Sequence, residues 1–387
     1  MFSERILQMA PSATLALNAK AQELKKQGVD VVNMAVGQPD FPIPENIKQA
    51  AIKAVEEGNS KYTPASGTPE LKQAIVDKFA RENNLQYEVA DIVVASGAKP
   101  ILYAAMLALC DPGDEVLVPS PYWVTYPDDI KLAGLKPVIV EAKEEDGFEI
   151  KAEKIAEKIT DRTKILILND PSNPTGGIIS EEEKRKIAEL CLKHDIWIMA
   201  DEMYERLVFD GEYFSIASID KDVWNKTITV NGLSKTYAMP GWRIGYAGMP
   251  PEVAKKIGGA LSHITGNPNA IAQVASIEAL NGPQDEVGKM REIYHKRRDM
   301  FVDGLNKING IKCVKPGGAF YLYPNLSGNY NDEISDSTKM AAKLLEEAHI
   351  AAVPGAAFGT DEHVRFSFAT SEERIQECLN RLEKLFG

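Results

Sequence analysis

A lysine and an arginine stand close together after a predicted buried strand, in the stretch NGLSKTYAMPGWRIG at residues 231–245. Residues 227–230, TITV, are apolar or β-branched and predict that strand. The amine of Lys235 can form a Schiff base with an aldehyde, and the guanidinium of Arg243 can bind a phosphate. The stretch therefore indicates a site for a ligand that carries both an aldehyde and an anionic group.

Polar or glycine-rich sequence also follows four other strand-like runs. These segments are SGAKP (96–100), PSPYW (119–123), NDPSNPTG (169–176) and DEMY (201–204). The carboxyl ends of parallel strands meet at one edge of a sheet, where open α/β folds bind their ligands. We therefore expect these segments to meet Lys235 in one crevice.

The residue types in these segments match the parts of one cofactor. An aspartate stabilises a protonated ring nitrogen, an aromatic side chain stacks on a ring, and a tyrosine or an asparagine binds a phenolic oxygen. A glycine turn before a helix, with Pro100 suited to its first turn, offers N–H groups to a phosphate. The sequence has neither the dinucleotide-binding nor the phosphate-loop glycine pattern of nucleotide sites. The set predicts pyridoxal 5′-phosphate.

Short apolar runs separated by helices must position these groups. Runs 92–95, 116–118, 165–168, 196–199 and 227–230 show little polar alternation, which is typical of parallel strands covered on both faces. A capping box of Ser180 and Glu183 predicts one intervening helix. The pattern predicts an α/β fold with a mostly parallel sheet.

The C-terminal third has a mixed pattern. It predicts helices at 286–309, 336–348 and 371–386, with short strands near 312–323 and 364–368. Residues 20–36 predict a helix followed by a strand. We expect this piece to pack with the C-terminal third, which makes the smaller domain discontinuous.

Composition narrows the class of protein. The chain has 387 residues, which suggests two domains, and its net charge of −12 disfavours a nucleic-acid partner. Its apolar runs are too short to span a bilayer, and its first residues, MFSER, do not resemble a signal peptide. The four cysteines are widely spaced and the five histidines form no H-x-x-x-H. We therefore expect a cytoplasmic protein with reduced cysteines, no membrane contact and no metal site.

Motifs along nearly the whole chain resemble those of the class I, fold-type I aminotransferases, and most closely the bacterial and archaeal aspartate aminotransferase branch. The most specific pattern comprises Ser234, Lys235, Tyr237, Pro240, Gly241, Arg243 and Gly245. The others are PSAT (11–14), AVGQPDF (35–41), YTPASGTPEL (62–71), NPTG (173–176), GGAFY (317–321) and VRFSFATS (364–371). The resemblance implies a three-layer α/β/α large domain at 45–280, a small α+β domain from 14–44 and 281–387, and an N-terminal arm at 1–13.

The resemblance also implies how the site would hold the cofactor ring. Lys235 would form the Schiff base, Asp201 would pair with the pyridine nitrogen, and Tyr204 and Asn173 would hold the phenolic oxygen. Trp123 would cover the ring and border the substrate, although Tyr122 could take that place.

The anionic groups would bind at the two ends of the site. The phosphate would bind backbone groups of Gly97, Ala98 and Lys99, with Ser234 and Arg243, and Tyr62 of a neighbouring subunit. The substrate α-carboxylate would bind Arg365, helped by Gly37 and Asn173. The contribution of Tyr62 implies a homodimer with shared active sites.

These parts imply an aminotransferase that moves the amino group of an L-amino acid to a 2-oxo acid. The reaction would be ping-pong, alternating between pyridoxal and pyridoxamine phosphate, with Lys235 as the general base. Aminotransferases for alanine, aromatic amino acids, methionine or kynurenine share these residues, as does a carbon–sulfur lyase on the same fold. A ligand-sensing regulator is a further alternative, but we expect no DNA-binding segment because the chain has no basic head.

The amino acid itself depends on fewer residues. Residues 259–269 contain no arginine, so one known way of binding a distal carboxylate is absent. Lys99 could bind that carboxylate instead, which would favour L-aspartate with 2-oxoglutarate, or it could only support the phosphate or point to solvent. Ser12 and Thr14 lie where the N-terminal segment could close over the substrate.

Overall fold

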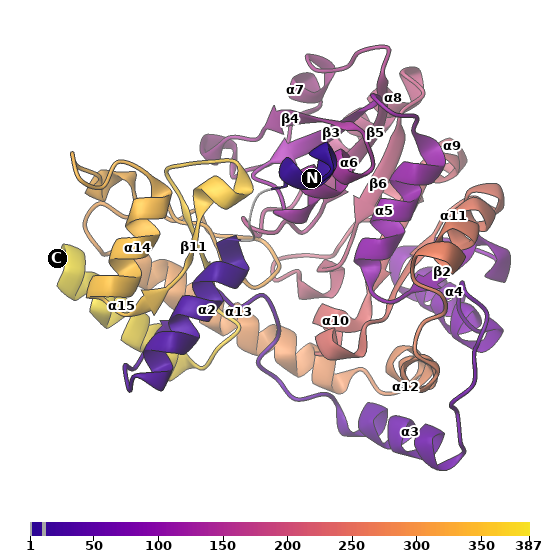
Figure 1. The fold of residues 1–387 in the computed structure, drawn as a ribbon, viewed down its shortest axis with the longest axis horizontal. Helices are drawn as coiled ribbons and strands as arrows, with labels where there is room; N and C mark the ends of the chain where they lie inside the picture. Colours follow the sequence, from indigo (N-terminus) through magenta and orange to yellow (C-terminus); the bar gives the residue numbers. More distant parts are fainter. Residues whose placement is uncertain (1, 10–12) are drawn as a thin grey trace.

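A seven-stranded sheet forms the centre of the molecule in the computed structural model, which describes residues 2–9 and 13–387 (Figure 1). The strands, in sheet order, are β2 (Ile92–Ala95), β8 (Gly245–Gly248), β7 (Thr227–Gly232), β6 (Trp197–Asp201), β5 (Thr163–Asn169), β3 (Glu115–Ser120) and β4 (Lys136–Glu141). All neighbours are parallel except β8, which is antiparallel to both β2 and β7. The prediction of a mostly parallel sheet is confirmed.

The five predicted strand runs correspond to β2, β3, β5, β6 and β7, whereas β4 and β8 were not predicted. The glycines that begin and end β8 carry no side chain, so its sequence lacks the apolar run that marks a buried strand. Strand β4 is a partly exposed edge strand. Its short apolar stretch gives a weaker signal than the central strands.

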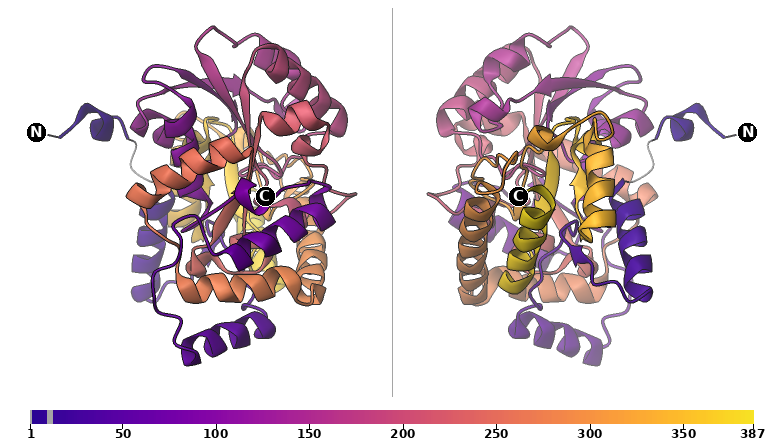
Figure 2. Two further views of the ribbon diagram at one scale, coloured as in Figure 1. Left: turned by 90° about the vertical axis from the view of Figure 1, so that its right-hand side faces the viewer. Right: turned by 90° about the vertical axis from the view of Figure 1, so that its left-hand side faces the viewer.

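Alternate residues of each strand face opposite helical layers, because side chains along a strand alternate between its faces. Val93 and Ala95 pack with α5 (Ala98–Leu109), α6 (Thr125–Leu132) and α11 (Pro251–Ile264). Ile92 and Val94 pack with α3 (Glu45–Glu56), α4 (Pro69–Asn83) and α12 (Ala270–Asn281). Helices α7 (Ala152–Ala156), α8 (Glu181–Lys193) and α9 (Lys221–Asn225) pack against Leu166 and Ile198. These layers form the expected three-layer α/β/α arrangement (Figure 2).

The predicted capping box of α8 forms only in part. Ser180 Oγ accepts a hydrogen bond from Glu183 N at 3.3 Å, as predicted. The Glu183 carboxylate, however, accepts from Ala152 N at 3.1 Å and pairs with Lys186. The reciprocal bond was wrongly predicted because a neighbouring helix offers Glu183 another donor.

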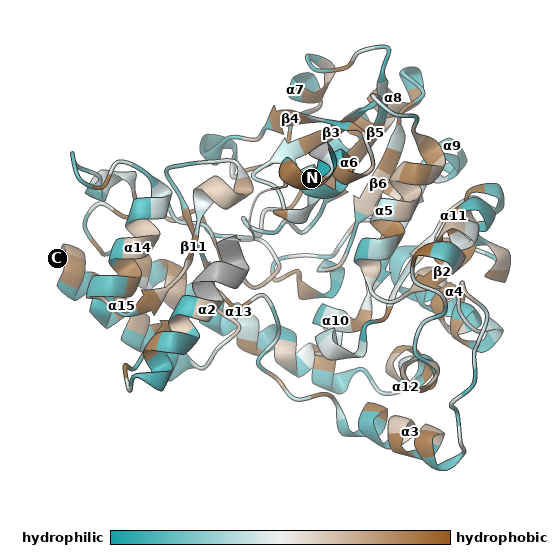
Figure 3. Ribbon diagram, viewed as in Figure 1, coloured by the Kyte–Doolittle hydropathy of each residue, from teal (hydrophilic) through white to brown (hydrophobic). Residues whose placement is uncertain are grey.

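The C-terminal third contains the helices α13 (Asp285–Leu305), α14 (Ser337–Glu347) and α15 (Glu372–Phe386). Its antiparallel sheet has the order β11 (Val353–Pro354), β12 (Val364–Ser367) and β9 (Tyr321–Leu322). In α15, Ile375, Cys378, Leu379 and Leu382 form a buried stripe at helical spacing, opposite a hydrophilic face (Figure 3).

The N-terminal piece α2 (Ala13–Lys26) and β1 (Val32–Asn33) lies among these C-terminal elements, where the indigo α2 stands beside orange and yellow segments in Figure 1. Val32 is the parallel partner of Ile350 in β10 (Ile350–Ala351). The expectation that residues 20–36 pack with the C-terminal third is therefore confirmed. The short α1 (Glu4–Leu7) contacts α6.

No helix within residues 2–9 and 13–387 is long and apolar enough to cross a membrane. Over the same residues, no cluster of three or more His, Cys, Asp or Glu side chains is arranged to hold a metal ion.

We predict that Gly245→Ala lowers the free energy of unfolding by about 3 kcal/mol, because an added methyl group would overlap backbone atoms. A Cβ at Gly245 would lie 2.2 Å from Ala98 N and 2.4 Å from Gly97 C, so β8 and the glycine turn would have to separate. The matched control is Gly241→Ala, where a Cβ meets no atom within 4 Å. Urea unfolding of both variants measures the difference. Equal stability of the two would contradict the prediction.

Candidate active site

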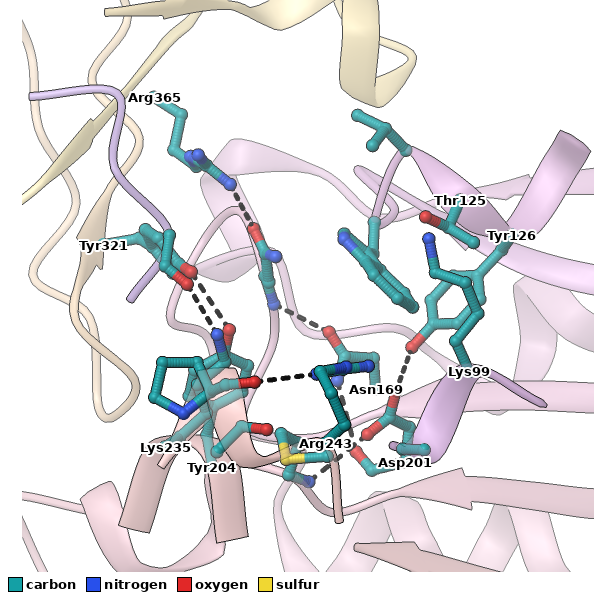
Figure 4. A pocket seen from close by; sticks show the side chains of 18 residues that line it. Lys99, Thr125, Tyr126, Asn169, Asp201, Tyr204, Lys235, Arg243, Tyr321 and Arg365 are labelled. Atoms are coloured by element: carbon teal, nitrogen blue, oxygen red, sulfur yellow. Dashed lines mark hydrogen bonds between the residues drawn. The ribbon is translucent and has the colours of Figure 1, made fainter. Parts of the chain in front are cut away.

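One pocket of about 460 Å³ lies at the carboxyl-terminal edge of the parallel strands (Figure 4). It collects side chains from after β2, β3, β5, β6 and β7, and from the C-terminal third. Its lining residues are Gly37, Ala98, Lys99, Trp123, Val124, Thr125, Tyr126, Asn169, Asn173, Asp201, Met203, Tyr204, Ser234, Lys235, Pro240, Arg243, Tyr321 and Arg365.

Lys235 lies on the single-turn helix α10 (Leu233–Thr236), directly after β7. Its Nζ donates a hydrogen bond to the Gly37 carbonyl oxygen at 2.5 Å. Burial, and next the positive charge of Arg365, lowers the pKa of Lys235 to about 8. An amine with this pKa holds a substantial neutral fraction near physiological pH, which a nucleophile or general base requires.

Asp201 is the last residue of β6, and its carboxylate is buried. Tyr126 Oη donates to Asp201 Oδ2 at 2.6 Å, and Met203 N donates to Oδ1 at 3.3 Å. Burial raises the pKa of Asp201, while these two hydrogen bonds and the charge of Lys235 oppose the rise. The side chain is therefore a buried hydrogen-bond acceptor whose orientation is fixed at the base of the pocket.

Arg365 enters the pocket from β12 with its side chain buried. Its Nη1 donates to Asn173 Oδ1 at 2.9 Å and its Nη2 donates to the Ala35 carbonyl at 3.0 Å. Its Nε has no hydrogen-bond partner, and no carboxylate of the described residues forms an ion pair with it. Burial lowers the pKa of this guanidinium. A buried cation without a counter-ion marks the place for an anionic group of a ligand.

Arg243 lies beside the glycine turn that precedes α5. The antiparallel pairing of Gly232 with Gly245 explains why: β8 starts at the edge where β7 ends, so Arg243 and Lys235 reach one pocket. Arg243 Nη1 donates to the Pro240 carbonyl at 3.0 Å and Nη2 to the Ser96 carbonyl at 3.4 Å. Gly97 has a φ of 96°, which suits glycine, and a Cβ there would overlap the Arg243 guanidinium.

Most of the predicted site residues meet in this pocket: Gly37, Ala98, Lys99, Trp123, Asn173, Asp201, Tyr204, Ser234, Lys235, Arg243 and Arg365. Trp123 lines it, whereas Tyr122 lies against Gly359 instead. Gly97 does not line the pocket, but it lies directly beside the Arg243 guanidinium. Tyr62 is not part of the pocket, since its side chain is 97 % exposed. Ser12 and the side chain of Thr14 lie outside the described part of the chain.

Two tyrosines of the pocket were not predicted as site residues. Tyr126, one helical turn after Trp123, binds Asp201, and Tyr321 binds Tyr204 Oη at 3.0 Å. A signal existed for both, because Tyr126 follows the strand-end segment at 119–123 and Tyr321 ends the GGAFY motif. Their partners are 75 and 117 residues away in sequence, so the contacts themselves could not be predicted.

Comparison with known proteins finds similarity along nearly the whole chain. The family model for aminotransferases of class I and II matches residues 29–382. The chain belongs to this family.

Individual relatives are similar over nearly their full length. A probable aspartate/prephenate aminotransferase of Aquifex aeolicus is 46% identical over 385 residues, which cover 99% of this chain and 98% of the relative. The aspartate aminotransferase of Rhizobium meliloti has a TM-score of 0.96 and 44% identity, covering 99% and 98% of the two chains. The Thermus thermophilus enzyme, solved with maleate, has a TM-score of 0.95 and 43% identity, covering 100% and 99%.

The protein is thus a pyridoxal-phosphate-dependent aminotransferase, and its pocket fits that cofactor. An amine with a lowered pKa, Lys235, lies in the same cavity as the buried carboxylate of Asp201. Arg243 stands against the turn at Gly97, where a side chain would overlap its guanidinium. These are the partners that an aldehyde, a protonated ring nitrogen and a phosphate require.

We predict that Lys235→Met stabilises the cofactor-free protein at pH 7 by no more than about 3 kcal/mol. The pKa of Lys235 falls from 10.5 to about 8 on folding, so the unfolded chain binds more protons between these values. Burial of this lysine therefore lowers the free energy of unfolding by its full amount below pH 8. The loss becomes smaller as the pH rises and is nearly gone at pH 10.5. Urea unfolding at pH 7 and pH 10 measures the difference.

The control for this experiment is Lys131→Met on α6, a partly exposed lysine outside the pocket. It should show the same small effect at both pH values. If the gain in unfolding free energy of Lys235→Met does not shrink between pH 7 and pH 10, the pKa of Lys235 is not lowered in the folded protein.

Proposed function

We propose that this aminotransferase transfers the amino group of L-aspartate to 2-oxoglutarate. The observation that carries the proposal is Arg365, a buried guanidinium without a carboxylate partner that lies in the same pocket as Lys235. The relatives named above include aspartate aminotransferases, one of them solved with maleate, which is a dicarboxylate. A second basic side chain in the pocket, Lys99, supports a substrate with two carboxylates.

The cofactor would be held by residues from every part of the pocket edge. Lys235 would bind its aldehyde, Asp201 its ring nitrogen, Tyr204 and Asn173 its phenolic oxygen, and Trp123 its ring face. The backbone groups of Gly97, Ala98 and Lys99, together with Ser234 and Arg243, would bind its phosphate. When bound, the cofactor supplies an aldehyde that takes up the amino group and a cationic ring that accepts electrons from the substrate Cα.

Lys235 would act as the general base for the substrate. Its Nζ, neutral in part because of its lowered pKa, would take the proton from the substrate Cα. Asp201 would keep a proton on the ring nitrogen, because a buried anion strongly favours a cation beside it. Tyr126 would hold Asp201 in the required orientation through its 2.6 Å bond.

Arg365 would fix the substrate through its α-carboxylate. The bonds to Asn173 and Ala35 already orient the guanidinium, so little freedom is lost when the carboxylate binds. Lys99 would bind the distal carboxylate. Its Nζ lies 4.9 Å from the centre of the Trp123 ring, on the wall of the pocket.

The assembly, the domains and the location are part of the same proposal. Tyr62 would reach the phosphate of a second subunit, which its 97 % exposure in one chain supports. Residues 14–44 and 281–387 would form the small domain that closes on the large domain at 45–280, and the pairing of β1 with β10 supports that division. A cytoplasmic location is supported by the absence of disulfides among the described cysteines.

The first test is the visible and near-ultraviolet absorption of the purified protein before and after addition of L-aspartate, with L-alanine in parallel. We expect a visible band from bound pyridoxal phosphate that aspartate converts to the pyridoxamine form. Conversion by alanine alone would refute the choice of substrate. A protein without a visible band, even after pyridoxal phosphate is added, would refute the role of Lys235.

The same samples separate the alternative activities. A carbon–sulfur lyase would release ammonia and pyruvate without a 2-oxo acid acceptor, whereas a transaminase requires one. Conversion by aromatic amino acids, methionine or kynurenine but not by aspartate would assign one of those substrates.

We predict that Lys99→Ala lowers kcat/KM for L-aspartate about tenfold relative to kcat/KM for L-alanine, because a charged hydrogen bond is lost. Steady-state kinetics with both donors measure the ratio. Lys131→Ala on α6 is the matched control, since this lysine lies outside the pocket. If Lys99→Ala leaves the aspartate-to-alanine ratio of kcat/KM unchanged, another group binds the substrate side chain.

A further inference from the structure

Tyr321, the last residue of the GGAFY motif, contacts both ends of the pocket. It lies on β9, opposite Ser367 of β12, and is 1 % exposed. Its hydroxyl is turned toward Tyr204 and its ring lies beside Arg365 (Figure 4). It therefore stands between the group proposed to hold the phenolic oxygen and the group proposed to hold the α-carboxylate.

The two tyrosine hydroxyls share one hydrogen bond of 3.0 Å. Each phenol has a single proton to donate. Tyr204 can donate to a cofactor oxygen only if the shared bond runs in the other direction, with Tyr321 as its donor. The Tyr321 hydroxyl then fixes where the Tyr204 proton points.

Arg365 favours this direction of the bond. Its guanidinium carbon lies 4.4 Å from the centre of the Tyr321 ring. Burial raises the pKa of both hydroxyls and the positive charge of Arg365 opposes the rise, but the neighbouring Tyr321 raises the pKa of Tyr204 further, well above its usual value, which leaves Tyr321 the better donor. The same contact holds the guanidinium over the ring of Tyr321, because an aromatic face attracts a cation.

The segment that contains Gly37 also lies close to the Tyr321 hydroxyl. A Cβ built on Gly37 would lie 3.3 Å from Tyr321 Oη, and the Gly37 carbonyl accepts the hydrogen bond of Lys235. The hydroxyl of Tyr321 thus lies among the backbone and side-chain groups that surround the reacting centre.

We propose that Tyr321 is a positioning residue for the transamination, with two separable parts. Its hydroxyl directs the proton of Tyr204 toward the cofactor, and its ring orients Arg365 for the substrate carboxylate. The proposal rests on the roles proposed above for Tyr204 and Arg365. A tyrosine that only fills the core between Phe320 and Tyr204 would contribute packing and neither of these effects.

The hydroxyl is tested by titrating the apoenzyme with pyridoxal phosphate and measuring the dissociation constant by protein fluorescence. The proteins are the wild type, Tyr204→Phe, Tyr321→Phe and the double variant. We expect Tyr321→Phe to raise the dissociation constant about fivefold, as the loss of one neutral hydrogen bond does. The double variant should bind like Tyr204→Phe within about twofold, because Tyr321 acts through Tyr204.

The ring is tested by titrating each holoenzyme with succinate, an unreactive dicarboxylate, and following the visible absorption. Tyr321→Phe keeps the ring and should bind succinate within about twofold of the wild type. Tyr321→Leu removes the ring and should bind succinate about tenfold more weakly, in line with the loss of a buried cation–π contact.

Tyr323→Phe is the matched control on the same segment. Its buried hydroxyl bonds Thr360 Oγ1 at 2.5 Å, outside the pocket, so both dissociation constants should stay unchanged. Thermal unfolding of every variant reports whether it is folded. A variant that loses packing alone would shift the unfolding temperature without changing either dissociation constant.

Failure of the proposal and failure of the proposed function give different results. If Tyr204→Phe binds pyridoxal phosphate like the wild type, the proposed role of Tyr204 is wrong. If Tyr204→Phe weakens binding and Tyr321→Phe does not, the role of the Tyr321 hydroxyl is overturned. An effect of Tyr321→Phe that persists fully in the double variant would also overturn it, and unchanged succinate binding in Tyr321→Leu would overturn the role of the ring.

Discussion

An excess of positive charge in one pocket is the constraint on which the rest of the site depends. Among the described residues, the pocket lining contains Lys99, Lys235, Arg243 and Arg365 but a single carboxylate, Asp201. Arg365 is buried and Lys235 is partly buried, whereas Lys99 and Arg243 are exposed at the mouth of the pocket. Uncompensated charge away from water is costly, so the fold must hold the two inner cations by hydrogen bonds to neutral groups. The carbonyl oxygens of Gly37 and Ala35 accept hydrogen bonds from Lys235 and Arg365, and those of Pro240 and Ser96 accept from the exposed Arg243. A phosphate and substrate carboxylates would complete the neutralisation, which makes the unliganded pocket complementary to anionic molecules.

On the opposite side of β6, buried charged groups are stabilised by other protein groups and not by a ligand. Asp201 and Glu202 are consecutive, so their side chains leave the strand on opposite faces. Glu202 accepts from Ser215 Oγ at 2.6 Å and from Asn83 Nδ2 at 3.3 Å, within a buried group that includes the Lys78–Glu205 ion pair. Burial, and next the charge of Glu205, raises the pKa of Glu202 to about 8. Here Lys78 and Glu205 balance each other inside the protein, and the hydrogen bonds of Glu202 anchor the end of the strand that carries Asp201.

Much of this protein could be read from local sequence. The apolar runs of β2, β3, β5, β6 and β7 and the helix stripes follow from periodicity, because each residue's burial repeats with the geometry of its element. The segments after those strands could be placed together, since parallel strands end at one edge of a sheet. That reasoning brought Lys235, Asp201, Asn173 and Trp123 into one pocket, where the structure has them. Strand β8 escaped prediction because a strand that begins and ends in glycine lacks an apolar run.

Only the tertiary structure decided the contacts between these segments. The bonds of Tyr126 with Asp201 and of Tyr321 with Tyr204 join residues 75 and 117 positions apart, and nothing in the local pattern of either partner specifies the other. The unused half of the Ser180–Glu183 capping box has the same cause, since a neighbouring helix supplied a competing donor. The sequence by itself determined the types of reactive group and the edge at which they gather. The packing of distant segments determined which proton donor faces which acceptor, because hydrogen bonding and charge act over a few ångströms of space rather than over residues of chain.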